Sequence, residues 1–314
     1  MKYRFNSFTE LSQILEEEKI PAPRYMIKRE MFISGSSEEA VIKELDRRIE
    51  VTRQALIKGL EHPQHSRSGL TKGAANAFTS AERGLVGDAL FRRAVAYSLA
   101  INEVNACGGK VVSFPTAGSS GIVPGVIWAW HDCKRGAGAV PQKPHRFSLP
   151  VAKPLSPPYT AELREAFLIS GLVGILISQG ATLAGSEGGC QAECGSAGAM
   201  AACAVSWLEG LPLDKCFSAA ALSLKNSLGL ACDPVAGLVE VPCVKRNAFV
   251  AVNALTAADM TLAGIESVIP FDEVVWAMKQ IGDSIPLAIK ETAMGGLALT
   301  PTGKAFKERT RGVL

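Results

Sequence analysis

Residues 166–186 read AFLISGLVGILISQGATLAGS and contain no Asp, Glu, Lys or Arg. A helix of this length could cross a bilayer. Several glycines dilute its hydrophobicity, however, Glu165 and Glu187 bracket it, and no cluster of Lys or Arg lies beside it to set an orientation. The stretch therefore predicts a buried helix in a protein that does not insert into membranes.

The segment that follows, GSAGAMAACAVSWL at residues 195–208, is built from small and apolar residues. Small side chains let helix backbones approach one another, so the centre of the protein is expected to be several closely packed helices. Strand-like alternation is confined to short pieces such as residues 110–114 and 238–241, and no internal repeat is evident. The sequence predicts an all-α fold with a compact multi-helix domain.

Upstream, the sequence predicts an amphipathic helical arm over residues 1–62. Ser7 and Glu10 form a capping-box pattern before a first helix, and Ser36 and Glu39 repeat that pattern before a second helix of roughly 24 residues. Apolar residues recur at helical spacing along the second helix: Ile42, Leu45, Ile49, Leu56 and Leu60. This face suits the core of the protein, and the alternative is a helix that docks a partner.

Residues 63–314 then form the main helical domain, interrupted by an insertion at about residues 131–160. In that insertion, prolines alternate with Lys and Gly from Pro141 to Pro158. Proline removes a backbone donor and ends helices, so the insertion is expected to be a loop or only partly ordered.

Composition excludes several classes of function. The chain has 314 residues, a net charge of +3 and 47% hydrophobic residues, which is typical of a globular protein. A binder of nucleic acid would show a clustered basic excess, which is absent here. The first residues, MKYRFNSFTE, are too polar for the apolar core of a signal peptide, so a cytoplasmic location with reduced thiols is expected.

Cys190, Cys232 and Cys243 are the candidate metal ligands. Their spacing matches neither a zinc ribbon nor a ferredoxin run, but each lies beside turn-forming Gly or Pro, where free backbone N–H groups can hydrogen-bond to sulfur. Cys194, four residues after Cys190, raises a rival site with four cysteines. Four thiolates would close the coordination shell, as in structural zinc, whereas three would leave an iron open to substrate. Spacing alone leaves both alternatives open.

The segment PTAGSSGIVPG, residues 115–125, is the candidate anion site. Gly118, Ser119 and Ser120 can turn N–H groups and hydroxyls toward a carboxylate or phosphate, although an ordinary helix-capping turn explains the pattern equally well. Neither nucleotide-binding glycine spacing is present. Lys225 is a cation in an apolar stretch, either at the edge of the core or paired with a carboxylate in a site.

Taken together, these segments resemble the alpha chains of the iron-sulfur-dependent L-serine dehydratases, and the resemblance covers nearly the whole chain. It rests on five motifs: NEVNA at 102–106, PTAGSSGIVPG, EGGCQAE at 187–193, KNSLGLACDPVAGLVEVPCVKRNA at 225–248, and GGLALTPTG at 295–303. The long cysteine-containing block is the most specific of them.

The resemblance implies a lyase that deaminates L-serine to pyruvate and ammonia in amino-acid catabolism and gluconeogenesis, without pyridoxal phosphate. It implies that Cys190, Cys232 and Cys243 hold a 4Fe-4S cluster with one iron free of protein thiolate, which would polarise the substrate hydroxyl. The hypothesis for substrate binding is that Gly118, Ser119 and Ser120 cradle the carboxylate, with Lys225 and Ser68 near it.

The resemblance also implies a beta-chain partner in a heterodimer. No histidine follows residue 150, and the resemblance implies that the proton-abstracting base is a histidine supplied by the beta chain. Two alternatives stay open: a related cluster lyase acting on L-cysteine or L-threonine, and a non-catalytic helical protein with a structural four-cysteine metal site.

The chain departs from the family pattern at three places. Arg67 replaces a histidine in the usual SHSGL segment, Cys194 stands where relatives carry a small apolar residue, and the Pro-rich insertion replaces a helix end and short turn. The roles of these three features are not defined by the pattern.

Overall fold

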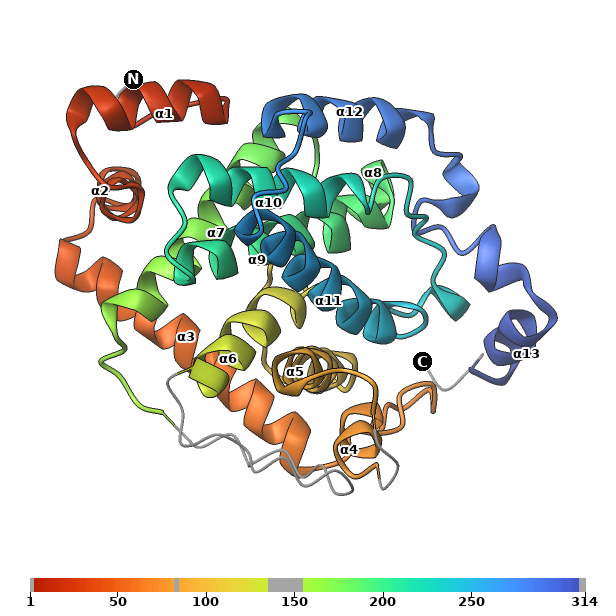
Figure 1. Ribbon diagram of the computed structural model, residues 1–314. Coiled ribbons are helices and arrows are strands. Elements are labelled where there is room, and N and C mark those ends of the chain that lie inside the picture. Colours follow the sequence, from red (N-terminus) through yellow and green to blue (C-terminus); the bar gives the residue numbers. More distant parts are fainter. Residues whose placement is uncertain (1–2, 82–84, 135–154, 311–314) are drawn as a thin grey trace.

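The computed structural model of the protein describes residues 3–81, 85–134 and 155–310, and the regular elements in these ranges are helices (Figure 1). No β-strand occurs in the described ranges, which contain two isolated β-bridges, His65 with Lys72 and Cys232 with Lys290. The predicted all-α class is therefore confirmed.

The first helices are α1 (Phe8–Glu18), α2 (Ala22–Ser34), α3 (Glu38–Glu61), α4 (Ala74–Thr79), α5 (Ala89–Ala106), α6 (Ile122–Lys134) and α7 (Ala161–Gly180). The remaining ones are α8 (Gly185–Gly188), the π-helix η1 (Gln191–Gly195), α9 (Ser196–Leu208), α10 (Leu213–Lys225), η2 (Val235–Gly237), α11 (Cys243–Leu262), α12 (Phe271–Ser284), η3 (Leu287–Ile289), η4 (Gly296–Leu299) and α13 (Pro301–Thr310).

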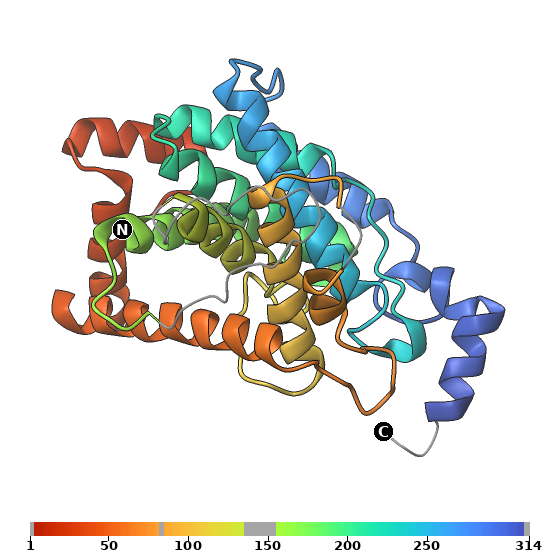
Figure 2. The same ribbon diagram turned by 60° about the horizontal axis from the view of Figure 1, so that its bottom comes forward.

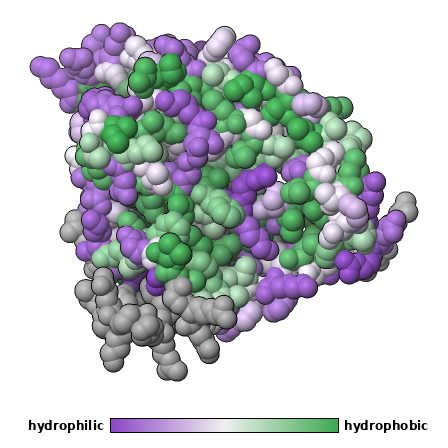
Figure 3. All heavy atoms as spheres, turned by 45° about the vertical axis from the view of Figure 1, so that its right-hand side comes forward, coloured by the Kyte–Doolittle hydropathy of each residue, from purple (hydrophilic) through white to green (hydrophobic). Residues whose placement is uncertain are grey.

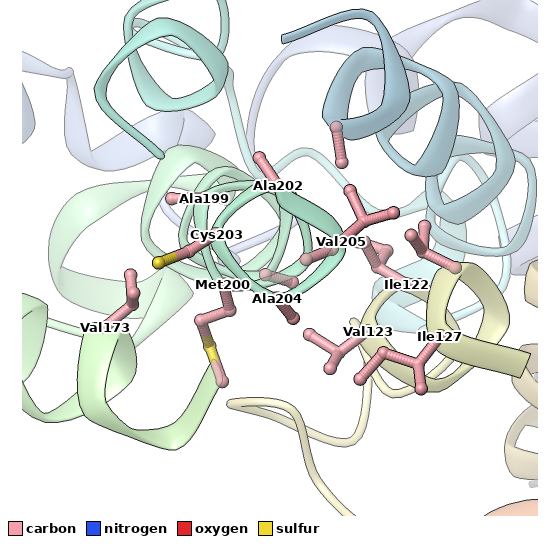
Figure 4. Packing of buried hydrophobic residues seen from close by; sticks show 14 of the residues in the cluster. Ile122, Val123, Ile127, Val173, Ala199, Met200, Ala202, Cys203, Ala204 and Val205 are labelled. Carbon is pink, nitrogen blue, oxygen red and sulfur yellow. The ribbon is translucent and has the colours of Figure 1, made fainter. Parts of the chain in front are cut away.

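Helix α9 forms the centre of the core. It packs against α6, α7, α10 and α11, and its alanines, Met200, Cys203 and Val205 lie among side chains of α6 and α7 (Figure 4). Nearly every residue of α9 is buried, so its composition of small apolar residues is what allows neighbours on all sides.

The uncharged stretch forms most of α7 and is buried along α9, as the sequence predicts. Among the described residues, no helix is both long enough and apolar enough to span a membrane. The uncharged stretch extends beyond α7, which ends at Gly180, and its last residues lead into α8.

Two glycines set how closely the helices approach. A Cβ atom at Gly198 of α9 would lie 2.8 Å from Val250 of α11 and 2.9 Å from the Ser223 hydroxyl of α10. At Gly59 of α3, a Cβ atom would lie 2.3 Å from the backbone oxygen of Ala100 in α5. Any side chain at either position would push two helices apart.

The N-terminal helices differ from the predicted pattern in two ways: α2, at Ala22–Ser34, lies between the two predicted helices, and the cap of the later helix is shifted. Ser7 caps α1 by accepting a hydrogen bond from the Glu10 N–H at 3.0 Å. The cap of α3 is Ser37, whose hydroxyl accepts from the Ala40 N–H at 3.2 Å, so the prediction of Ser36 was wrong by one residue. Adjacent serines can both serve as caps, and the helix register decides between them.

Helix α3 faces the core rather than lying free. Its apolar face, including Ile49 and Leu56, is buried, and it packs across α5 (Figures 1 and 2). The division into residues 1–62 and 63–314 stays a prediction. Of the proposed insertion, residues 131–134 belong to α6, and residues 135–154 lie outside the described residues.

A buried polar cluster joins α3 to α5 and α6. The Arg53 guanidinium is 2% exposed, donates to Asp132 Oδ2 at 2.9 Å and lies 4.6 Å from the centroid of the Trp128 ring. The Tyr97 hydroxyl donates to the same Asp132 oxygen at 2.8 Å. Burial raises the pKa of Asp132, but the hydrogen bond from His131 and the charge of Arg53 outweigh it and hold that pKa below its usual value.

Replacing Arg53 with methionine should lower the free energy of unfolding by about 3 kcal/mol, because Asp132 would stay buried without its cation. Chemical denaturation measures the change. Arg48→Met, on the same helix with its side chain 59% exposed, should have almost no effect. Equal effects of the two variants would contradict a structural role for the buried pair.

Candidate functional site

The loop at residues 115–121 and the start of α11 are held together by the side-chain amide of Asn247. Its Nδ2 donates to the Gly118 oxygen at 2.8 Å and to the Cys243 oxygen at 2.9 Å, while its Oδ1 accepts from the Gly121 N–H at 3.0 Å. Asn102 of α5 adds a second donor to the Gly118 oxygen, at 2.9 Å. The candidate anion loop is thereby fixed beside the helix that begins with Cys243.

The three candidate metal ligands lie in one buried region. Cys190 directly precedes η1, Cys232 follows α10 in an irregular segment, and Cys243 is the first residue of α11. A negative charge on Cys190 raises the pKa of both Cys232 and Cys243, so the three sulfurs lie within electrostatic range. No group of three or more His, Cys, Asp or Glu side chains in the described ranges is arranged to hold a metal ion.

Cys190 is set apart from the other two thiols by its hydrogen bonds. The bond from the Cys194 thiol, helped by the charge of Arg246, lowers the pKa of Cys190 to about 6 against the opposing effect of burial. The same bond, together with burial, raises the pKa of Cys194 well above its usual value. Cys194 is therefore a protonated donor to the Cys190 thiolate.

Cys232 is tied to the C-terminal part of the chain. Its N–H donates to the Ile289 oxygen at 2.9 Å, and its own oxygen accepts from the Glu291 N–H at 2.7 Å. Burial raises the pKa of Cys232. Burial also raises the pKa of Cys243, to about 12. Both groups therefore favour the neutral thiol in the metal-free protein.

Glu193 is a site residue that the sequence analysis missed. Its Oε2 lies 3.9 Å from the Cys232 sulfur, and its carboxyl also receives a hydrogen bond from Thr116. Burial raises the pKa of Glu193 to about 7, and the charges of Cys190 and Glu291 act in the same direction. The signal was available, since this carboxylate lies between Cys190 and Cys194 in the sequence.

The serines of the loop have different environments. Ser119 Oγ donates to the Phe114 oxygen at 2.8 Å and lies 3.0 Å from the Thr116 hydroxyl, so it is used in holding the loop. Ser120 Oγ is buried without a hydrogen-bond partner. An unpaired buried hydroxyl is costly and therefore marks a position that a ligand can satisfy.

Ser68 and Lys225 differ from the residues of the loop at 115–121 in their surroundings: Ser68 bonds to Glu240, and Lys225 lies at the end of α10. Ser68 Oγ donates to Glu240 Oε1 at 2.6 Å, while Thr71 donates to the other oxygen of that carboxylate at 2.7 Å. Lys225 is half-buried at the end of α10, and no ion pair of its ammonium is found in the described part of the chain. Arg67, in the segment that departs from the family pattern, is exposed.

Fold and site together define an all-helical protein with a site of thiols and carboxylates beside the loop at residues 115–121, the Gly/Ser loop. The family model described as serine dehydratase alpha chain matches residues 17–298. The chain therefore belongs to the serine dehydratase alpha chain family.

Named relatives match over almost all of the chain. A probable L-serine dehydratase alpha chain of Bacillus subtilis is 42% identical over 98% of this chain and 96% of the relative. The L-serine dehydratase alpha chain of Peptoniphilus asaccharolyticus is 37% identical over 96% of this chain and 97% of the relative. A protein of Streptomyces coelicolor, named L-serine dehydratase, is 33% identical over 95% of this chain but only 62% of the relative.

The raised pKa of Glu193 predicts a pH effect on the stability of the iron-free chain. The folded state holds this proton up to about pH 7, whereas the unfolded chain releases it near the ordinary value of 4.5. The free energy of unfolding should therefore fall between these values as pH rises, by about 3 kcal/mol. Glu193→Gln should remove that fall in denaturation curves measured across this range.

The exposed Glu273→Gln on α12 is the matched control and should keep the wild-type pH profile. If Glu193→Gln kept that profile as well, the carboxyl of Glu193 would not be the group responsible.

Proposed function

We propose that this chain is the alpha subunit of an L-serine dehydratase that converts L-serine to pyruvate and ammonia. The observation that carries the proposal is the buried contact, through Asn247, of the Gly/Ser loop with the helix that begins at Cys243. This contact supports the proposal, because it brings the loop that would bind the substrate carboxylate next to the helix that begins with a candidate iron ligand. The names of the relatives support L-serine as the substrate, ahead of L-cysteine or L-threonine.

The proposed cofactor is a 4Fe-4S cluster held by Cys190, Cys232 and Cys243. The donor set fits, because buried thiols are the usual ligands of such clusters. Each thiolate of a cluster site binds a different iron, so these sulfurs need not converge on one ion. When bound, the cluster would supply Lewis-acid polarisation of the substrate hydroxyl.

The groups around the thiols support this ligand set. Arg246 brings a positive charge to Cys190 and, through its Nη1, donates to the Ala231 oxygen at 2.8 Å, next to Cys232. Cys194 donates to Cys190, which makes it a neighbour of the ligand set rather than a fourth ligand. These contacts favour three thiolates over the structural four-cysteine site.

The proposed substrate site is the loop at Gly118, Ser119 and Ser120, which leads into the first turn of α6. A helix N-terminus favours an anion such as the substrate carboxylate. Ser120 Oγ and Asn102 Oδ1 are both buried without partners, and they could serve the carboxylate and the ammonium of an amino acid. Ser68 would position Glu240, and Lys225 would add positive charge from the end of α10.

The proposed partner is a beta chain, forming a cytoplasmic heterodimer that serves amino-acid catabolism and gluconeogenesis. Apolar side chains are exposed in the segments tied to Cys232, including Leu287 at 66% and Met294 at 55%. Figure 3 shows apolar residues bordering a hollow with polar residues on this side of the molecule. A surface of this kind is typical of a protein interface.

The beta chain would also supply the base, as a histidine. No histidine of this chain follows residue 150, whereas Glu193, beside Cys232, is a carboxyl that holds a proton near neutral pH. The longer Streptomyces relative, of which this chain covers 62%, supports a requirement for additional sequence.

The metal content of the chain tests the cofactor. After anaerobic purification and reconstitution, about four irons and four sulfides per chain are expected, and both should be lost in air. Cys190→Ala, Cys232→Ala and Cys243→Ala should each lose most of the iron, while Cys194→Ala should keep it. Zinc without sulfide, or loss of metal in Cys194→Ala, would overturn the three-thiolate site.

The two serines should respond differently to alanine substitution in assays with the beta chain. Ser120→Ala should raise KM for L-serine about 10- to 100-fold with normal stability and iron content, because a hydrogen bond to a charged substrate is lost. Ser119→Ala should lower the melting temperature, since the loop loses its bond to Phe114. An unchanged KM in Ser120→Ala would remove Ser120 from the substrate site.

A further inference from the structure

A cleft of about 320 Å³ lies between α2, α3 and α7, and none of the cysteines lines it. Its apolar wall includes the Phe114 and Phe167 rings, whose centroids are 5.7 Å apart, together with Leu168 and Ile175. The volume is at the lower end of the range for small-molecule sites, about 300–1,000 Å³. Figure 1 shows these helices on the side of the molecule away from α8 and α13.

Gly171, in the middle of α7, enlarges this cleft. Glycine is unfavourable inside a helix, so a structural reason for it is expected. A Cβ atom at Gly171 would meet no atom within 4 Å, whereas one at Gly174, on the same helix, would lie 3.2 Å from Met200. Packing thus explains Gly174, while Gly171 only adds open space to the cleft.

Arg29 provides a positive charge at the cleft, and its guanidinium carbon lies 5.7 Å from the centroid of the Phe5 ring. Its Nε is buried without a hydrogen-bond partner, and it forms no ion pair with any carboxylate of the described residues. Arg48, which also lines the cleft, donates to Glu44 at 2.8 Å and is therefore already paired. A guanidinium offers a planar pair of donors that matches a carboxylate.

We propose that this cleft binds a small monocarboxylate with an apolar body, such as a phenyl- or branched-alkyl-substituted acid. The carboxylate would pair with Arg29, and the apolar body would lie against Phe114 and Phe167 above Gly171. A polyanion does not fit, because Glu30 and Glu44 also line the cleft. L-Serine does not fit either, since it has no apolar body to contact these rings.

The occupied cleft would act on the loop at residues 115–121. Phe114, which lines the cleft, directly precedes this loop, and its backbone oxygen accepts from Ser119 Oγ at 2.8 Å. A ligand against the Phe114 ring therefore restrains the backbone that holds Ser119. That the loop binds substrate rests on the function proposed above, whereas binding in the cleft does not.

Binding of 3-phenylpropionate to the full chain, measured by titration calorimetry, tests the proposal without any assay of activity. Arg29→Met should weaken binding by about tenfold or more, as should replacement of the ligand by 3-phenylpropan-1-ol, because each change removes one charge of the ion pair. Gly171→Leu, which fills the open space, should abolish binding. Hydrogen exchange of the amides at 115–121 should slow when the ligand is bound.

Two control variants separate the cleft from general effects on folding. Gly171→Ala has room for its methyl group and should retain binding, and Arg48→Met removes a paired cation and should change affinity by less than about threefold. The proposal is overturned if the wild-type chain does not bind at millimolar concentration, if Arg29→Met and Gly171→Leu bind normally, or if L-serine displaces the probe. Absence of dehydratase activity would bear only on the proposed function.

Discussion

The amide of Asn247 is the contact on which the arrangement of the site depends. Its nitrogen serves backbone oxygens of Gly118 and Cys243, and its oxygen accepts from Gly121, so all three bonds hold backbone rather than side chains. The residue is completely buried, where an amide with unmade bonds is costly. Only a side chain with both donors and an acceptor, at this length, can join the loop to α11 in this way.

Near that contact, several polar groups lie in unfavourable environments. Ser120 Oγ and Asn102 Oδ1 are buried without partners, and the half-buried Glu193 has a pKa of about 7. The core built around α9, in contrast, consists almost entirely of alanine and other small apolar residues in close contact. Buried hydroxyls without partners also occur on α9, at Ser196 and Ser206, so it is the position of Ser120 and Asn102 at the loop, beside the thiols, that points to a ligand.

The α2–α3–α7 cleft shows the same contrast within a single helix. Gly174 of α7 is required by Met200 of α9, whereas Gly171 has no neighbour that requires it. The same helix thus contributes one face to the core and another to an open cleft beside Phe114. Because Phe114 leads into the Gly/Ser loop, the cleft and the thiol site share one segment of backbone.

The sequence by itself determined the helical class, the buried position of α7 and the family, because these depend on local composition, periodicity and long specific motifs. It also placed the cap of α1 at Ser7, although for α3 it chose Ser36 where the helix begins after Ser37. Only the tertiary structure decided that Ser119 is paired while Ser120 is not, that Ser68 contacts Glu240, and that Glu193 lies against Cys232. Two of these contacts, Ser68 with Glu240 and Glu193 with Cys232, join residues far apart in the chain, whereas the Ser119 bond to Phe114 is local and depends on how the loop folds. The long-range contacts follow from how η1 and the loops that carry Ser68, Cys232 and Glu240 come together, which no local pattern encodes.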